Sequence, residues 1–125
     1  MATLEPILAV DDSAPIREMI AAILAARGHR VVTAADGREA LERLRDAVEP
    51  YVVLLDIVMP RLDGLALCAE IERDPQIRDS GHRIILMSST LRLSAPDIPA
   101  TAGQLVKPFS RQQLIEAIEA VRLTA

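Results

Sequence analysis

Short apolar runs alternate with helix-like segments along the 125 residues, and this alternation limits the possible folds more than any other feature. Continuous rather than alternating apolar runs are typical of strands that are covered on both faces. The runs of strand length are residues 6–10, 31–34, 52–55, 84–87 and 105–106. Strands separated by amphipathic helices form a parallel sheet between two helical layers. The sequence therefore predicts one α/β domain of five units over residues 1–125, with 52–55 as the central strand.

Capping residues mark where the connecting helices begin and end. Ser13 before Pro15 predicts a helix start, and Gly28 predicts the end of the same helix. Ser110 and Gln113 have the spacing of a capping box at the head of the last helix. The side chains expected to face the sheet are Ile16, Ile20, Ile23 and Leu24, then Ala40, Leu41 and Leu44, then Leu65, Cys68 and Ile71, and finally Leu114, Ile115, Ile118 and Val121.

The segment that should supply a fourth helix, residues 88–103, contains two prolines. Pro96 and Pro99 each remove a backbone donor and crowd the preceding turn. We therefore expect a short or irregular helix there, followed by a weak fifth strand.

Charge and composition exclude several kinds of partner. The net charge of −4 disfavours a phosphate backbone or an anionic membrane, and two aromatic residues are too few for stacking on bases. No apolar run is long enough for membrane insertion. The single Cys68 excludes an internal disulfide, so we expect a cytoplasmic protein with this thiol in the core. His29 and His82 follow glycines and are expected in surface turns rather than at a metal.

Polar residues follow four of the five predicted strands. They are Asp11 and Asp12, then Asp56, then Ser88 and Ser89, and finally Lys107 before Pro108. Each has an ordinary structural explanation on its own, because aspartate caps helices and serine and proline are common in loops. In a parallel sheet, however, all of these positions meet at one edge, where ligands bind.

Three carboxylates at one edge repel each other unless a cation lies among them. Asp11, Asp12 and Asp56 offer only oxygen ligands, which indicates a hard divalent ion, and Mg²⁺ is the best candidate. Together with Lys107, such an ion could stabilise a phosphoryl group on a carboxylate.

These residues resemble the receiver domain of two-component response regulators over essentially the whole chain. Residues 54–64, Leu-Leu-Asp-Ile-Val-Met-Pro-Arg-Leu-Asp-Gly, are similar to the phosphoacceptor motif. The pair Asp11-Asp12, the hydroxyl of Ser88 and the sequence 107–109, Lys-Pro-Phe, support the match. The resemblance implies a flavodoxin-like doubly wound sheet with strand order 2-1-3-4-5.

The resemblance also implies the roles of individual residues. Asp56 would accept a phosphoryl group from a histidine kinase or a histidine phosphotransfer protein. Asp11, Asp12, Asp56 and the backbone carbonyl of Val58 would bind Mg²⁺. Lys107 would contact a phosphoryl oxygen, next to a cis bond to Pro108, and Ser88 would be the switch hydroxyl. The protein would then act as a signalling switch on a downstream protein partner, rather than as an enzyme.

Two other functions stay open at this point. One is an Asp-nucleophile phosphohydrolase, although the acid/base position two residues after Asp56 holds apolar Val58. The other is a receiver-like binding module that works without phosphorylation. Gln104 stands where many receivers carry a switch aromatic, so the output surface is expected to depart from the family pattern.

Overall fold

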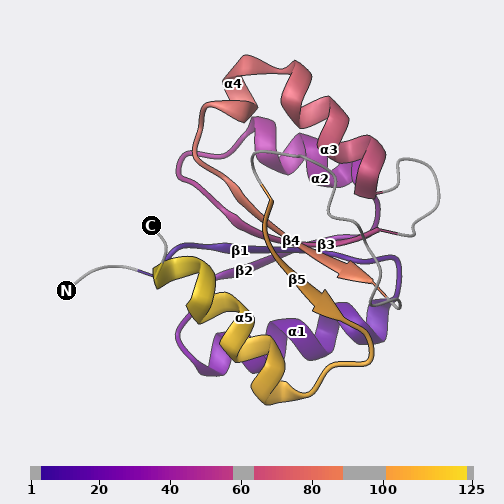
Figure 1. Ribbon diagram of the computed structural model, residues 1–125, viewed down its shortest axis with the longest axis vertical. Helices are drawn as coiled ribbons and strands as arrows, with labels where there is room; N and C mark the ends of the chain where they lie inside the picture. Colours follow the sequence, from indigo (N-terminus) through magenta and orange to yellow (C-terminus); the bar gives the residue numbers. More distant parts are fainter. Residues whose placement is uncertain (1–3, 58–63, 89–100, 124–125) are drawn as a thin grey trace.

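The structure is a computed structural model that describes residues 4–57, 64–88 and 101–123. Strands and helices alternate through most of this part of the chain (Figure 1). The strands are β1 (Ile7–Val10), β2 (Val31–Ala34), β3 (Val52–Asp56), β4 (Arg83–Ser88) and β5 (Thr101–Val106). The helices are α1 (Ala14–Ala26), α2 (Gly37–Arg45), α3 (Gly64–Arg73), α4 (Pro75–Arg78) and α5 (Arg111–Leu123). None of the helices in the described ranges is long and apolar enough to cross a bilayer.

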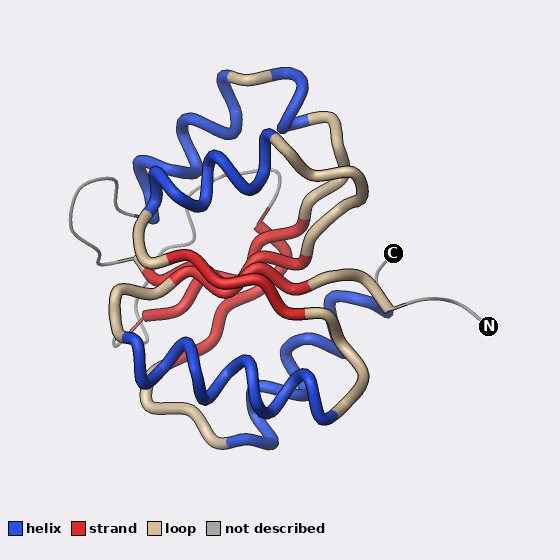
Figure 2. The backbone as a smooth tube through the Cα atoms, turned by 180° about the vertical axis from the view of Figure 1, so that it is seen from behind, coloured by secondary structure: helices blue, strands red, loops and turns tan. Residues whose placement is uncertain are grey.

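The strands form one parallel sheet in the order β2-β1-β3-β4-β5. Helices α1 and α5 cover one face, while α2, α3 and α4 cover the other (Figures 1 and 2). The doubly wound α/β fold and the central place of β3 are thus confirmed. Because every strand runs in the same direction, the residues that follow the strands lie along one edge of the sheet.

Successive residues of the central strands enter two separate aliphatic cores, as side chains on a strand point to alternate faces. In β3, Val53 and Leu55 pack toward α2 and α3, whereas Val52 and Leu54 pack toward α1 and α5. All four side chains are fully buried. This explains why the strand is apolar throughout, without polar alternation.

The predicted helix caps are present. The Ser13 side chain accepts a hydrogen bond from the Ile16 backbone N–H at the start of α1. Gly28 follows the helix with φ +92°, a left-handed conformation that glycine adopts without strain. Ser110 and Gln113 form the reciprocal capping box that their spacing predicts, with hydrogen bonds of 2.8 and 3.0 Å.

Helix α3 differs from the prediction in its rotation. Leu65 was expected to face the core, but it is 42% exposed. The buried positions are Gly64, Leu67, Cys68 and Ile71, which follow the i, i+3, i+4, i+7 stripe of a helix. The prediction missed this rotation because Leu65 fits a stripe with Cys68 and Ile71 almost as well.

The segment after α3 and the fifth strand also differ from the prediction. Helix α3 ends at Arg73, and Pro75 opens the additional short helix α4, with the Asp74 side chain as its cap. The expected irregular helix falls mainly on residues 89–100, including Pro96 and Pro99, which lie outside the described residues. Strand β5 is longer than residues 105–106, because it pairs with β4 from Thr101 onward, past an irregularity between Ile84 and Ile85.

Candidate functional site

The predicted acids meet at the carboxyl edge of the sheet. Asp11 directly follows β1 and Asp56 ends β3, and these two strands are neighbours. Asp11 is fully buried and Asp56 is 6% exposed, whereas Asp12 is exposed. Carboxylate oxygens of the three residues all lie within 4.8 Å of one another. The structure therefore brings together all three side chains that the sequence predicted as cation ligands.

Lys107 reaches the acid cluster from the end of the edge strand β5. It follows β5, yet its ammonium lies 2.6 Å from Asp11 Oδ2 and 3.2 Å from Asp56 Oδ2. Burial of the ammonium acts to lower the pKa of Lys107, but hydrogen bonds and charge from Asp11 and Asp56 outweigh it, so the pKa is raised above its ordinary value. The lysine is therefore charged at neutral pH, and it partly neutralises the acid cluster.

Ser88 and Lys107 are held next to each other by the sheet. Ser88 ends β4, pairs with Val106 and is 9% exposed. Its carbonyl oxygen accepts a 2.6 Å hydrogen bond from the Lys107 backbone N–H, and the following bond to Pro108 is cis, as predicted. The hydroxyl-bearing residue and the lysine are thus fixed in register at the same edge as Asp56.

Two structural contributions to the site were missed at the sequence level. Arg17 on α1 donates a 2.7 Å hydrogen bond from Nη1 to the Asp11 carbonyl oxygen. Gly64, the first residue of α3, packs directly on the Asp56 backbone and donates its N–H to the Ile57 carbonyl at 3.0 Å. Helical spacing gave no signal for the contact of Arg17, whereas Gly64 ends the motif at 54–64, which did not reveal its close approach to Asp56.

Some predicted features lie elsewhere or outside the described residues. Val58, the predicted carbonyl ligand, is not among the described residues. Gln104 lies exposed on β5. Cys68 is fully buried, as predicted. Burial, with a smaller effect from the nearby Glu72 charge, raises the pKa of its thiol to about 11.

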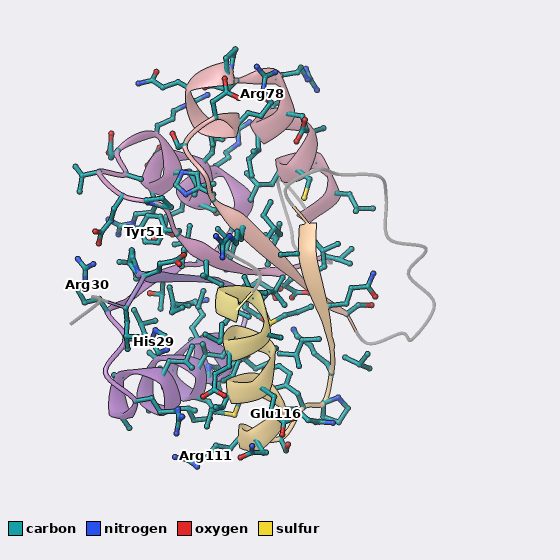
Figure 3. All side chains as sticks on the ribbon, turned by 60° about the vertical axis from the view of Figure 1, so that its left-hand side comes forward. His29, Arg30, Tyr51, Arg78, Arg111 and Glu116 are labelled. Atoms are coloured by element: carbon teal, nitrogen blue, oxygen red, sulfur yellow. The ribbon has the colours of Figure 1, made fainter. Side chains whose placement is uncertain are left out.

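The prediction for the histidines was wrong, because His29 and His82 are 9% and 6% exposed. His82 stacks on the Tyr51 ring, and its Nδ1 accepts a 2.9 Å hydrogen bond from the Tyr51 backbone N–H. The adjacent glycines adopt positive φ angles, as residues in turns do, but the histidines that follow them are buried. His29 and Tyr51 lie on the same side of the molecule (Figure 3). They precede β2 and β3, whereas Asp11 and Asp56 lie at the opposite ends of β1 and β3.

Comparison with known proteins identifies the family. Residues 7–119 match the response regulator receiver domain. The chain is 35% identical over 117 residues to protein PilG of Pseudomonas aeruginosa, covering 91% of this chain and 84% of that protein. Among solved structures, chemotaxis response regulator CheY4 of Vibrio cholerae superposes with a TM-score of 0.83 at 31% identity, covering 95% of this chain and 99% of the other. The chain belongs to the response regulator receiver domain family.

Other relatives are longer proteins. The chain is 40% identical over 124 residues to the probable transcriptional regulator ycf27 of Guillardia theta, covering 95% of this chain but 46% of that protein. It thus spans about half the length of most of the curated relatives that it matches. Response regulator TrrA of Thermotoga maritima, whose structure is in complex with Mg²⁺-BeF, superposes with a TM-score of 0.79 at 30% identity, covering 94% of this chain and 99% of the other.

Proposed function

We propose that this protein is a phosphorylatable signalling switch that accepts a phosphoryl group on Asp56 in a Mg²⁺-dependent reaction. The observation that carries the proposal is the meeting of Asp56 with Asp11, Asp12 and Lys107 at one edge of the sheet. An isolated carboxylate has no means of stabilising a transferred phosphoryl group. Here a nearly buried carboxylate has an ammonium 3.2 Å away and two further acids within reach of a common cation.

The acid cluster fits a hard divalent cation. Its donors are three carboxylates with no nitrogen or sulfur ligand among them, and their negative charge exceeds the single positive charge of Lys107. Asp11, Asp12 and Asp56 would hold Mg²⁺, together with the backbone carbonyl of Val58 that the family resemblance adds. When bound, the ion would neutralise charge on the phosphoryl oxygens during transfer. The TrrA complex with Mg²⁺-BeF supports this choice of ion in a relative.

The proposed transfer needs only one nucleophile from this chain. A carboxylate oxygen of Asp56 attacks the phosphorus of a phosphohistidine, a P–O bond forms, and the P–N bond breaks. The electron pair of the broken bond stays on the imidazole nitrogen, which takes up a proton from solvent. Lys107 is already 3.2 Å from the Asp56 carboxylate and can donate to a phosphoryl oxygen of the product.

Ser88 is proposed as the switch residue. The new phosphoryl group adds negative charge and acceptor oxygens beside the end of β4. The Ser88 hydroxyl can donate to one of these oxygens, and any movement of Ser88 is transmitted to Lys107 through their 2.6 Å backbone hydrogen bond. We propose that this local change alters binding of a downstream protein.

The proposed phosphodonor is a histidine kinase or a histidine phosphotransfer protein. We propose that residues 1–125 form a single receiver domain that acts in the cytoplasm, where kinases draw on ATP. The protein would be a substrate and a slow autophosphatase rather than a turnover enzyme. The net charge of −4 supports a protein partner rather than direct binding to nucleic acid or insertion into a membrane.

Phosphorylation by a small donor tests the proposal directly. The protein would be incubated with acetyl phosphate, with and without Mg²⁺, and its intact mass measured. We expect one added phosphoryl group that requires Mg²⁺ and is removed by hydroxylamine, which cleaves acyl phosphates. Asp56→Asn should abolish the product, while Asp79→Asn, at an exposed carboxylate on the C-cap of α4, should leave it unchanged.

Labelling, phosphate release and partner capture, measured on wild type and Asp56→Asn, separate the other functions. Equal labelling of wild type and Asp56→Asn would disprove Asp56 as the acceptor. Sustained release of phosphate from excess donor at a constant rate would favour a phosphohydrolase. A binding partner captured equally by wild type and Asp56→Asn, with and without phosphodonor, would favour a module that works without phosphorylation.

A further inference from the structure

The peptide bond between Asp11 and Asp12 joins two of the three acids in the cluster, and α1 holds it in place. The Asp11 carbonyl oxygen belongs to a fully buried residue and accepts a 2.7 Å hydrogen bond from Arg17 Nη1. The Arg17 backbone N–H in turn bonds to the Ser13 carbonyl at 3.0 Å, within the first turn of α1. The guanidinium that contacts this peptide is therefore carried by a residue in the first turn of α1.

Asp11 is fixed at every polar atom. Its backbone N–H donates to the Ala34 carbonyl at 3.2 Å, and its Oδ1 accepts from the Ser13 backbone N–H at 2.9 Å. Its Oδ2 accepts from Lys107 at 2.6 Å, and its carbonyl oxygen accepts from Arg17. Of these four contacts, only the one from Arg17 acts on the peptide plane that leads to Asp12.

The Asp12 side chain has no comparable support. It is exposed, and no described residue makes a hydrogen bond or an ion pair with its carboxylate. The direction of its side chain toward Asp11 and Asp56 is therefore set by its own backbone. Arg17 holds the peptide that precedes Asp12, and the bond from the Ser13 N–H to Asp11 Oδ1 holds the peptide that follows it.

We propose that Arg17 is a positioning residue for the cation site: it fixes the Asp11–Asp12 peptide and thereby the placement of the Asp12 carboxylate. The inference rests on the proposed function, because it concerns the same acid cluster. Arg17 would not touch the ion or the phosphoryl group. It acts as the outer-shell groups of metal sites do, by orienting the groups that bind the ion.

Two effects of Arg17 on cation affinity have opposite signs, so they can be separated. The Arg17 guanidinium lies 2.7 Å from the Asp11 carbonyl oxygen, and its positive charge there repels a divalent cation at the neighbouring acid cluster. If this repulsion were its only effect, removal of the guanidinium would tighten Mg²⁺ binding. Loss of positioning would weaken binding, because Asp12 would have to be ordered when the ion binds. The direction of the change in Kd on Arg17→Met decides which effect dominates.

Titration calorimetry with MgCl₂ alone, without phosphodonor, is the test. We expect Arg17→Met to raise the Kd for Mg²⁺ by about 10-fold, the lower end of the loss seen for outer-shell partners. Arg17→Lys keeps a charged donor group at this position and should give a Kd between those of wild type and Arg17→Met. The matched control is Arg83→Met, which removes another arginine Nη1 that donates to a main-chain carbonyl, that of Val121 at 2.8 Å, but at the start of β4.

Arg83→Met should lower the free energy of unfolding in urea without changing the Kd for Mg²⁺. An unchanged or lower Kd in Arg17→Met would overturn the inference, and so would an equal rise in Arg83→Met, which would indicate general destabilisation. If wild type itself binds no Mg²⁺, the proposed cation site fails before any variant is compared. Should Arg17→Met not fold, the Kd of Arg17→Lys against wild type decides in the same way.

Discussion

Gly64 lies so close to Asp56 that a side chain cannot be added without moving one of them. A Cβ atom placed on Gly64 would lie 2.6 Å from the Asp56 carbonyl oxygen and 2.8 Å from the Ile57 Cα. Both neighbours are backbone atoms, so no side-chain rotation can relieve the contact. The start of α3 is therefore packed against the chain segment that carries the proposed phosphoacceptor.

Gly64→Ala should damage both stability and phosphorylation. We expect the free energy of unfolding to fall by about 1–3 kcal/mol, the usual cost of forcing extra atoms into a packed site. Because the contact is with Asp56 itself, the rate of Mg²⁺-dependent labelling by acetyl phosphate should fall as well. Urea unfolding and intact mass measured over time check the two effects.

The matched control is Gly103→Ala on β5. A Cβ there would meet its nearest atoms, on the side chains of Val121 and Ile85, at 3.9 and 4.0 Å, which are ordinary contacts. This variant should keep wild-type stability and labelling. If both alanine variants behave alike, the close approach of Gly64 to Asp56 is not the cause of the effect.

The central part of the fold and the main site residues could be predicted because short-range patterns determine them. The continuous apolar run at 52–55 identified the buried central strand, and the parallel direction of the strands placed Asp11, Asp56 and Lys107 at one edge. The capping box of Ser110 and Gln113 likewise depends on residues three positions apart. Beyond the parallel direction of the strands, these features need no knowledge of how distant segments pack.

The missed features all depend on packing between segments. Helix α3 exposes Leu65 and packs Gly64 against Asp56, an arrangement that spacing alone does not show. The edge strand β5 begins at Thr101 because β4 supplies hydrogen bonds to its backbone, even though residues 101–104 lack a strand pattern. Arg17 resembles any arginine on a helix surface until the Asp11 carbonyl is placed beside it.

Lys107 is the single lysine of the chain, so its ammonium can be observed without assignment. In protein labelled with ¹³C-lysine, the Cε resonance should titrate above the ordinary pKa of 10.5, because the charges of Asp11 and Asp56 outweigh the effect of burial. Asp11→Asn should lower this pKa more than Asp56→Asn, since the two carboxylates lie 2.6 and 3.2 Å from Nζ. The reverse order would contradict the pairing in the structure.

The raised pKa of Lys107 also predicts a stability change in alkali. The folded state holds the lysine proton more tightly than the unfolded chain, so the ion pairs contribute fully below pH 10.5 and are lost as the pH rises through the folded-state pKa. Lys107→Met should lack this part of the alkaline loss. Comparing urea unfolding of the two proteins from pH 9 to pH 12 checks this; parallel curves would count against it.

Cys68 should add its own alkaline instability at a lower pH. Above its ordinary pKa of 9.0 the unfolded chain releases the thiol proton, while the buried thiol of the folded protein keeps it up to about pH 11. The contribution of the protonated Cys68 thiol to the free energy of unfolding is therefore complete below pH 9 and is lost between pH 9 and about pH 11. Cys68→Ala should be less stable at pH 7 because of the lost packing, but its stability should fall less steeply over this range in urea unfolding.

His82 should make the protein sensitive to acid. Burial lowers the pKa of His82 below its ordinary value of 6.5, and protonation at Nδ1 would also break the hydrogen bond from the Tyr51 N–H. The folded state thus binds this proton less readily than the unfolded chain, so stability is fully present above pH 6.5 and decreases as the pH falls toward the folded-state pKa. Urea unfolding from pH 7.5 to pH 5 should show this decrease.

Two variants separate the titration of His82 from its structural role. His82→Asn can keep an acceptor for the Tyr51 N–H but cannot titrate, so its stability should change less than that of wild type between pH 6.5 and pH 5. His82→Leu removes the acceptor and leaves the N–H without a partner, which should cost about 1–3 kcal/mol at pH 7.5. If His82→Asn loses stability in acid as steeply as wild type, another group must cause the acid sensitivity.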